Sequence, residues 1–166
     1  SLGGYVALAF AEKHPQKIKG LCLMNATSNE DDNKRKTLRT RANKMIQNNF
    51  TNMVRMSFTN LFGAQSRLLF KEEINAALKE ALKTPIQGYI AAQEGMKIRI
   101  NRNAILAENN FKKLLIVGEN DPVLDFKSLV AEAKKTGSEI VVFPNGHMPH
   151  IENKNALSTT LKSFVR

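Results

Sequence analysis

The chain has 166 residues, of which 42% are hydrophobic and 24% charged, and its net charge is +10. This composition is typical of one ordinary globular domain and excludes a disordered chain. No apolar run reaches the roughly 18 residues that a membrane-spanning helix requires, so we predict no membrane span.

The first elements are a helix and a strand. Residues 2–13 place apolar side chains among small residues without proline, which predicts a buried helix that ends before His14-Pro15. Residues 17–26, "KIKGLCLMNA", are typical of a short buried parallel strand. The single cysteine, Cys22, lies in this run, and we interpret it as a small buried hydrophobic residue rather than a reactive thiol. Without a disulfide framework, the sequence favours a reducing, cytoplasmic location.

The segment from 28 to 104 is polar, charged and helical in pattern throughout, and we predict a helical cap, or lid. Its apolar positions include Met45, Met53, Met56, Phe58, Phe62, Leu68 and Leu69. Residues 33–44, "NKRKTLRTRANK", hold much of the excess positive charge. Such a stretch binds nucleic acid or an anionic membrane, or is the solvated face of a helix. No stacking aromatic residues interrupt it, so we favour the solvated face and predict no nucleic-acid partner.

The remaining elements alternate strand with helix. Residues 112–120 and 138–146 are apolar runs that end in Gly or Asn, and the helix between them ends at Gly137 as its C-cap. The last stretch, "NALSTTLKSFVR", is a further amphipathic helix. This order predicts an α/β fold with a parallel sheet and right-handed crossovers. We assign residues 1–27 and 105–166 to the core and residues 28–104 to the cap.

Three residues fall in an order that indicates catalysis. Ser1 stands directly before a helix, Asp121 follows the strand "LLIVGEN", and His147 follows the strand "EIVVFPNG". A serine hydroxyl becomes a good nucleophile when an imidazole accepts its proton, and a carboxylate holds the tautomer of that imidazole. Loops at one edge of a parallel sheet bring such residues together, so we predict that the three side chains lie at one sheet edge.

Four blocks of sequence resemble the α/β-hydrolase fold family with a helical cap. "SLGG" resembles the second half of its G-x-S-x-G-G nucleophile elbow, and "HPQKIKGLCLMNA" its following helix end and strand. "LLIVGENDPV" is similar to the strand and turn that carry the acid, and "NGHMPHIEN" to the Gly-His loop with its later glutamate. In this family the chain order is serine, acid, histidine.

The resemblance implies a serine hydrolase that cleaves a carboxylic ester or similar acyl bond of a small-molecule substrate through an acyl-enzyme. Ser1 would be the nucleophile, Asp121 the orienting acid, His147 the base, and the Leu2 backbone N–H one oxyanion donor. The glycines at positions 3 and 4 would keep the start of the helix thin beside the elbow. A serine nucleophile argues against the epoxide hydrolases and dehalogenases of the family, which use Asp.

The resemblance also implies missing parts. The family places about five strands before the nucleophile, together with the loop that supplies the second oxyanion donor. We therefore expect this chain to be a segment of a longer protein, and its oligomeric state stays open. We predict no cofactor and no metal, because three scattered histidines and one cysteine offer no ligand spacing.

Each assignment has an alternative. Ser1 alone could be a helix N-cap, and its free α-amino group could act as base, as in N-terminal-nucleophile hydrolases with antiparallel sheets. Asp125 and Glu119 compete for the role of the acid, although Asp125 is placed to cap the next helix. His150 competes for the role of the base, and His14 is structural. A non-catalytic binding protein on the same fold, or a basic helical module for anionic partners, is the alternative function.

Overall fold

A computed structural model describes all 166 residues, and its centre is a three-stranded parallel sheet. The strands, in the order β1-β2-β3, are β1 (Gly20–Met24), β2 (Lys112–Gly118) and β3 (Glu139–Phe143). Each strand lies inside the run predicted for it and is shorter than that run. The parallel pairing confirms the predicted α/β class, and it contradicts the antiparallel sandwich of N-terminal-nucleophile hydrolases.

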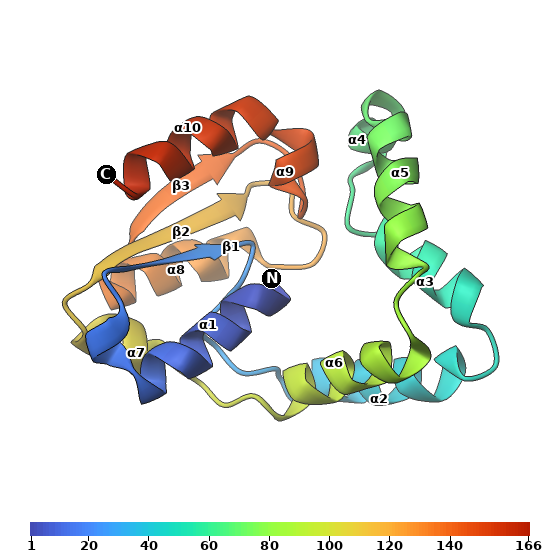
Figure 1. The fold of residues 1–166 in the computed structure, drawn as a ribbon, viewed down its shortest axis with the longest axis horizontal. Helices are drawn as coiled ribbons and strands as arrows, with labels where there is room; N and C mark the ends of the chain where they lie inside the picture. Colours follow the sequence, from blue (N-terminus) through green and yellow to red (C-terminus); the bar gives the residue numbers. More distant parts are fainter.

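The middle strand β2 divides two hydrophobic layers, because alternate side chains of a strand face opposite sides. Leu115 and Val117 join the core beneath α1 (Leu2–Lys13) and α8 (Phe126–Thr136). Leu114 and Ile116 instead pack toward α10 (Lys154–Phe164) on the other face. Helices therefore cover both faces of the sheet (Figure 1). Gly137 ends α8 in the left-handed conformation with φ 64°, as the sequence predicts.

The first helix is less buried than the sequence predicts. Only Leu8 and Ala11 of α1 are buried, whereas Val6 is 63% exposed and Phe10 46% exposed. Within this chain α1 packs against β1, α6 and α7, and Val6 and Phe10 lie on the sides of the helix that these elements leave uncovered. A 3-10 turn, η1 (Pro15–Lys17), follows the helix.

Helices fill the segment between β1 and β2. They are α2 (Asn33–Ile46), α3 (Phe50–Thr59), α4 (Ala64–Leu69), α5 (Lys71–Ala81), α6 (Ile86–Ile98) and α7 (Asn103–Glu108). The helices α2 to α6 form a second group beside the sheet (Figure 1), with a small core of Ile46, Met53, Val54 and Leu78. The boundary predicted at residue 104 falls inside α7, which packs against α1 and α8.

Several predicted apolar positions of this segment are exposed rather than packed. Met45 and Met56 are 57% and 53% exposed, and Leu68 and Leu69 are 81% and 65% exposed. Phe62, in contrast, is fully buried. The apolar pattern of the sequence thus predicts the helices well, but the face that each helix buries depends on neighbours that the pattern does not reveal. No helix of the structure is both long enough and apolar enough to cross a membrane.

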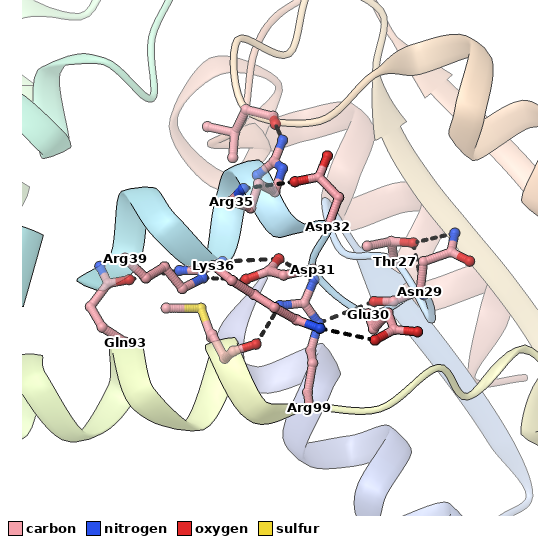
Figure 2. Close-up of polar contacts among 12 residues, drawn as sticks. Thr27, Asn29, Glu30, Asp31, Asp32, Arg35, Lys36, Arg39, Gln93 and Arg99 are labelled. Carbon is pink, nitrogen blue, oxygen red and sulfur yellow. Dashed lines mark hydrogen bonds and ion pairs between the residues drawn. The ribbon is translucent and has the colours of Figure 1, made fainter. Parts of the chain in front are cut away.

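A buried ion-pair cluster joins the loop after β1 to α2 and to the end of α6 (Figure 2). Asp31, in the loop after β1, has a side chain with no exposed surface and pairs with Arg39 of α2 and with Arg99. The Arg99 guanidinium lies 2.8 Å from Asp31 and stacks 4.1 Å above the Tyr5 ring of α1. Burial opposes ionisation of Asp31, but hydrogen bonds and charge from both arginines outweigh it and lower the pKa of the carboxyl.

The cationic stretch of α2 is used partly inside the molecule. Arg39 binds Asp31, Arg35 donates to the Val123 carbonyl, and Lys36 lies 3.1 Å from Glu30. The cations Lys34, Arg41 and Lys44 form no ion pair and are exposed. Half of the stretch therefore positions α2, and the rest is the solvated face that the sequence favours.

Candidate active site

The loops after β2 and β3 bring Asp121 and His147 together. Asp121 follows β2 and His147 follows β3, and both loops leave the carboxyl edge of the sheet (Figure 1). The His147 Nδ1 lies 2.7 Å from the Asp121 Oδ2, and both side chains are almost completely buried. A carboxylate can only accept, so Nδ1 carries the proton and Nε2 is left to accept one.

Asp121 is held by donors on both of its oxygens. The backbone N–H groups of Val123 and Leu124 donate to Oδ1 at 2.7 and 3.1 Å. His147 and the side-chain amide of Asn25, at 2.9 Å, share Oδ2. Burial disfavours the charged carboxyl, but the hydrogen bond and charge of His147, followed by the Asn25 amide, lower its pKa. Asp121 is therefore a fixed anion beneath the imidazole.

The histidine loop is gripped by a buried carboxylate. Glu152 belongs to the short helix α9 (Pro149–Glu152), which the sequence does not predict. Its Oε1 accepts from the Gly146 N–H at 3.2 Å and its Oε2 from the Met148 N–H at 3.0 Å. These two groups flank His147 in the chain, so Glu152 fixes the backbone on both sides of the imidazole.

Gly118 lets the same loop pass closely over the end of β2. A Cβ at this position would lie 2.2 Å from the Gly146 carbonyl oxygen and 2.7 Å from that of Asn145. The loop makes one further contact with the helical segment, where the His147 N–H donates to the Leu61 carbonyl at 3.1 Å.

Ser1 stands at the N-terminus of α1 with its side chain free of hydrogen bonds. Ser1 lies at the same edge of the sheet, because the start of α1 passes the end of β1, where a Cβ on Gly4 would lie 2.7 Å from the Cβ of Ala26 (Figure 1). No hydrogen bond joins Ser1 to His147, so the structure brings together two of the three predicted residues and leaves the third nearby. The Leu2 N–H also has no partner in the chain, as an oxyanion donor requires.

The two glycines after Ser1 differ. A Cβ on Gly4 would lie 2.7 Å from the Cβ of Ala26, so this position needs glycine where α1 crosses the end of β1. A Cβ on Gly3 would meet nothing within 4 Å, so within this chain no neighbouring atom requires a glycine at position 3.

The other residues considered for the roles of acid and base have different contacts. Asp125 caps α8 by accepting from the Ser128 N–H at 2.8 Å, and Glu119 is exposed. His150 is exposed and bonds no carboxylate, and burial is the main cause that lowers its pKa. His14 packs with its ring centroid 5.0 Å from that of Phe10.

The Cys22 thiol is not activated, and no group of side chains is placed to hold a metal ion. Cys22 is half-buried rather than buried as predicted, and its surroundings raise the pKa of the thiol to about 11 by desolvation. It is therefore a poor nucleophile at neutral pH. No three His, Cys, Asp or Glu side chains lie close enough together to hold a metal ion.

Sequence reasoning missed Asn25, Gly118 and Leu61 as parts of this site. The glycine that ends "IVG" and the asparagine that follows β1 do carry a weak signal, because Gly and Asn favour turns and close approach. Leu61 contributes only a backbone carbonyl, which any residue would supply.

An apolar groove begins beside the predicted nucleophile. Its volume is about 510 Å³, and it runs between α1 and α6 from Leu2 past Tyr5 and Val6 to Ala92 and Met96. Two arginines, Arg99 and Arg102, also line it.

Comparison with known proteins identifies relatives. The sequence model of a family described as "alpha/beta hydrolase fold" matches residues 1–154. A thermophilic esterase from Thermogutta terrifontis is 26% identical, with a TM-score of 0.90, over 99% of this chain and 61% of its own. An enol-lactonase from Burkholderia xenovorans LB400 shares the fold, with 19% identity, a TM-score of 0.86, and 99% and 63% coverage.

An esterase from Exiguobacterium antarcticum has the same fold, with 17% identity, a TM-score of 0.86, and 99% and 64% coverage. The chain thus spans 61 to 64% of the length of these three structures. No curated protein sequence matches it.

Proposed function

Because the chain belongs to the α/β-hydrolase fold family, we propose that it is a serine hydrolase that cleaves a carboxylic ester or a similar acyl bond. The observation that carries the proposal is the buried pair of His147 Nδ1 and Asp121 Oδ2, 2.7 Å apart. An imidazole held in this way has the tautomer of a general base. The esterase and lactonase relatives support the same reaction class.

In the proposed reaction, the Ser1 Oγ attacks the carbonyl carbon while the His147 Nε2 accepts its proton. The negative charge moves to the carbonyl oxygen, where the Leu2 N–H stabilises it at the positive end of α1. The imidazolium then protonates the leaving alcohol, and the acyl group stays on Ser1. A water molecule then attacks the acyl-enzyme while His147 accepts its proton, which releases the carboxylic acid product and restores the Ser1 hydroxyl. Asp121 stays ionised throughout.

The helices α2 to α6 are proposed to form the cap over the carboxyl edge of the sheet. Their contact with the histidine loop through the Leu61 carbonyl supports that placement.

A fluorophosphonate probe, which reacts only with an activated serine, tests the proposal together with turnover of a short acyl ester. We expect labelling and turnover in the full protein and neither after Ser1→Ala. Ser158→Ala is the matched control, because Ser158 is an exposed serine of α10. A protein that is folded but is not labelled and turns over no ester would instead be a non-catalytic binding protein on this fold.

A further inference from the structure

Asn25 is unusual in its backbone. It is the first residue after β1, its φ is 44°, and it is the only non-glycine residue of the chain with a positive φ. It is 1% exposed, and its N–H donates to the Ile116 carbonyl at 2.9 Å, which continues the β1–β2 ladder. Backbone strain of this kind gathers at functional sites.

The side chain of Asn25 joins the acid to the histidine loop. Its Nδ2 donates to the Asp121 Oδ2 at 2.9 Å and to the Gly146 carbonyl at 3.2 Å, so both amide hydrogens are used. A flipped amide would turn an acceptor toward two other acceptors, and the network therefore assigns this orientation. Gly146 precedes His147, so one side chain contacts the groups on both sides of the Asp121–His147 bond.

The arrangement keeps a buried acceptor without a partner. Asn25 Oδ1 is buried and accepts no hydrogen bond. A buried unpartnered oxygen is unfavourable by itself, whereas asparagine tolerates a left-handed backbone better than most residues. Glycine would form the same turn without that cost, since it adopts a positive φ freely and has no side chain. The amide at this position therefore has a purpose other than the turn.

We propose that Asn25 is a positioning residue that fixes Asp121 against His147. With Val123 and Leu124 on Oδ1 and Asn25 on Oδ2, the carboxylate cannot rotate away from the imidazole. The second donation, to Gly146, sets the distance between the two loops. The inference rests on the proposed function, because it concerns the orientation of the proposed base.

The test is Asn25→Gly, which keeps the left-handed turn and removes the amide. We expect kcat for a short acyl ester to fall on the order of 10–100-fold, the size typical of losing a group that orients a functional side chain. KM should change less than twofold, because Asn25 contacts no predicted substrate position.

Asn120→Gly is the matched control. Asn120 also ties the loop after β2 to the loop after β3, by donating to the Pro144 carbonyl at 2.7 Å, but its side chain forms no hydrogen bond with Asp121 or His147. If tying the loops were the whole role, both glycine variants would lose the same activity. We expect Asn120→Gly to stay within about twofold of the wild-type kcat.

Asn25→Asp provides a second variant that keeps the shape of the side chain. It places a carboxyl group against two acceptors, the Asp121 carboxylate and the Gly146 carbonyl, so it keeps at most one of the two donated hydrogen bonds, and only while it is protonated. We expect kcat to fall, and to fall further as the pH rises, because loss of that proton leaves two adjacent carboxylates that repel each other. The inference is overturned if both Asn25 variants are folded and keep wild-type kcat and pH profile while Ser1→Ala is inactive. If Ser1→Ala keeps its activity, the proposed function itself fails.

Discussion

The ion-pair cluster around Asp31 is the clearest place to test how the helical segment is attached. We consider Asp31→Asn, which removes the charge and keeps the shape, so that no cavity forms. The side chain of Asp31 has no exposed surface, and those of Arg39 and Arg99 are 15% and 8% exposed. The substitution thus leaves two largely buried guanidinium groups without their anion.

The magnitude follows from the partners that remain. Removing one member of a buried ion pair costs about 3–5 kcal/mol of unfolding free energy. Arg39 keeps the Gln93 Oε1 at 2.7 Å, and Arg99 keeps the Met96 carbonyl at 2.8 Å. Because these acceptors remain, we expect a loss at the lower end of that range, about 3 kcal/mol of unfolding free energy. For a chain of this size that corresponds to a fall in Tm of about 6–12 °C.

Urea unfolding followed by circular dichroism measures the effect, with Glu30→Gln as the matched control. Glu30 is the neighbouring carboxylate, and its pair with Lys36 is exposed, so its loss should cost about 0–1 kcal/mol.

The pKa of Asp31 is lower in the folded state. Its stabilisation is therefore complete at neutral pH and is lost as the pH falls below about 4. Equal unfolding free energies for the Asp31→Asn and Glu30→Gln variants at pH 7 would refute this account of the cluster.

Four further predictions concern the proposed site and the Cys22 thiol. His147→Ala and Ser1→Ala should each abolish ester turnover, by a factor on the order of 10⁶, and the double variant should be barely slower than either one; equal rates in His147→Ala and wild type would remove the proposed base. His150→Ala should keep most of the activity, because His150 bonds no carboxylate, and steady-state kinetics decides this. Gly118→Ala should lower the unfolding free energy measured in urea by about 1–3 kcal/mol, because its Cβ would overlap the Gly146 carbonyl. Gly95→Ala is the control and should not lower it, because a Cβ at Gly95 would meet nothing within 4 Å. Cys22 should react with iodoacetamide at pH 8 on the order of a hundredfold more slowly than a free thiol, since its pKa is raised to about 11; a reaction as fast as that of free cysteine, measured by mass spectrometry, would contradict that pKa.

The fold was predictable where the pattern is local. The buried runs of β2 and β3 and the cap at Gly137 depend on nearest neighbours, so the sequence alone indicates them. The face of α1 that stays exposed within this chain, which includes Val6, was not predictable, because burial depends on which elements pack against the helix. The exposed Met45 and Leu68 make the same point for the helical segment. A periodic pattern identifies a helix, but which side is covered depends on elements far away in the sequence.

The sequence alone predicted the acid and the histidine of the site, but not all of the contacts that hold them in place. Asp121 and His147 follow recognisable strands, and their chemistry requires those residue types. Whether Ser1 completes a triad with them stays a prediction. Glu152 is the glutamate of the block "NGHMPHIEN", so its position carried a signal although its two backbone contacts did not. Asn25 acts through hydrogen bonds to groups that only the folded loops bring near, and Leu61 acts through its backbone. Such contacts leave no motif, because a carbonyl or an N–H is present at almost every position of the chain.

The supports nevertheless explain how the helical segment can influence the base. Glu152 of α9 and Asn25 at the end of β1 each form a hydrogen bond with Gly146 of the histidine loop. The Leu61 carbonyl, between α3 and α4, accepts a hydrogen bond from the His147 N–H. Two of these contacts come from the core, and the third comes from the segment proposed as the cap. A cap that moved away would remove the third contact and leave the other two, so the imidazole would stay paired with Asp121 while its backbone gained freedom. If the helices α2 to α6 form the proposed cap, its position and the backbone of the proposed base are linked through one backbone hydrogen bond rather than through a side chain.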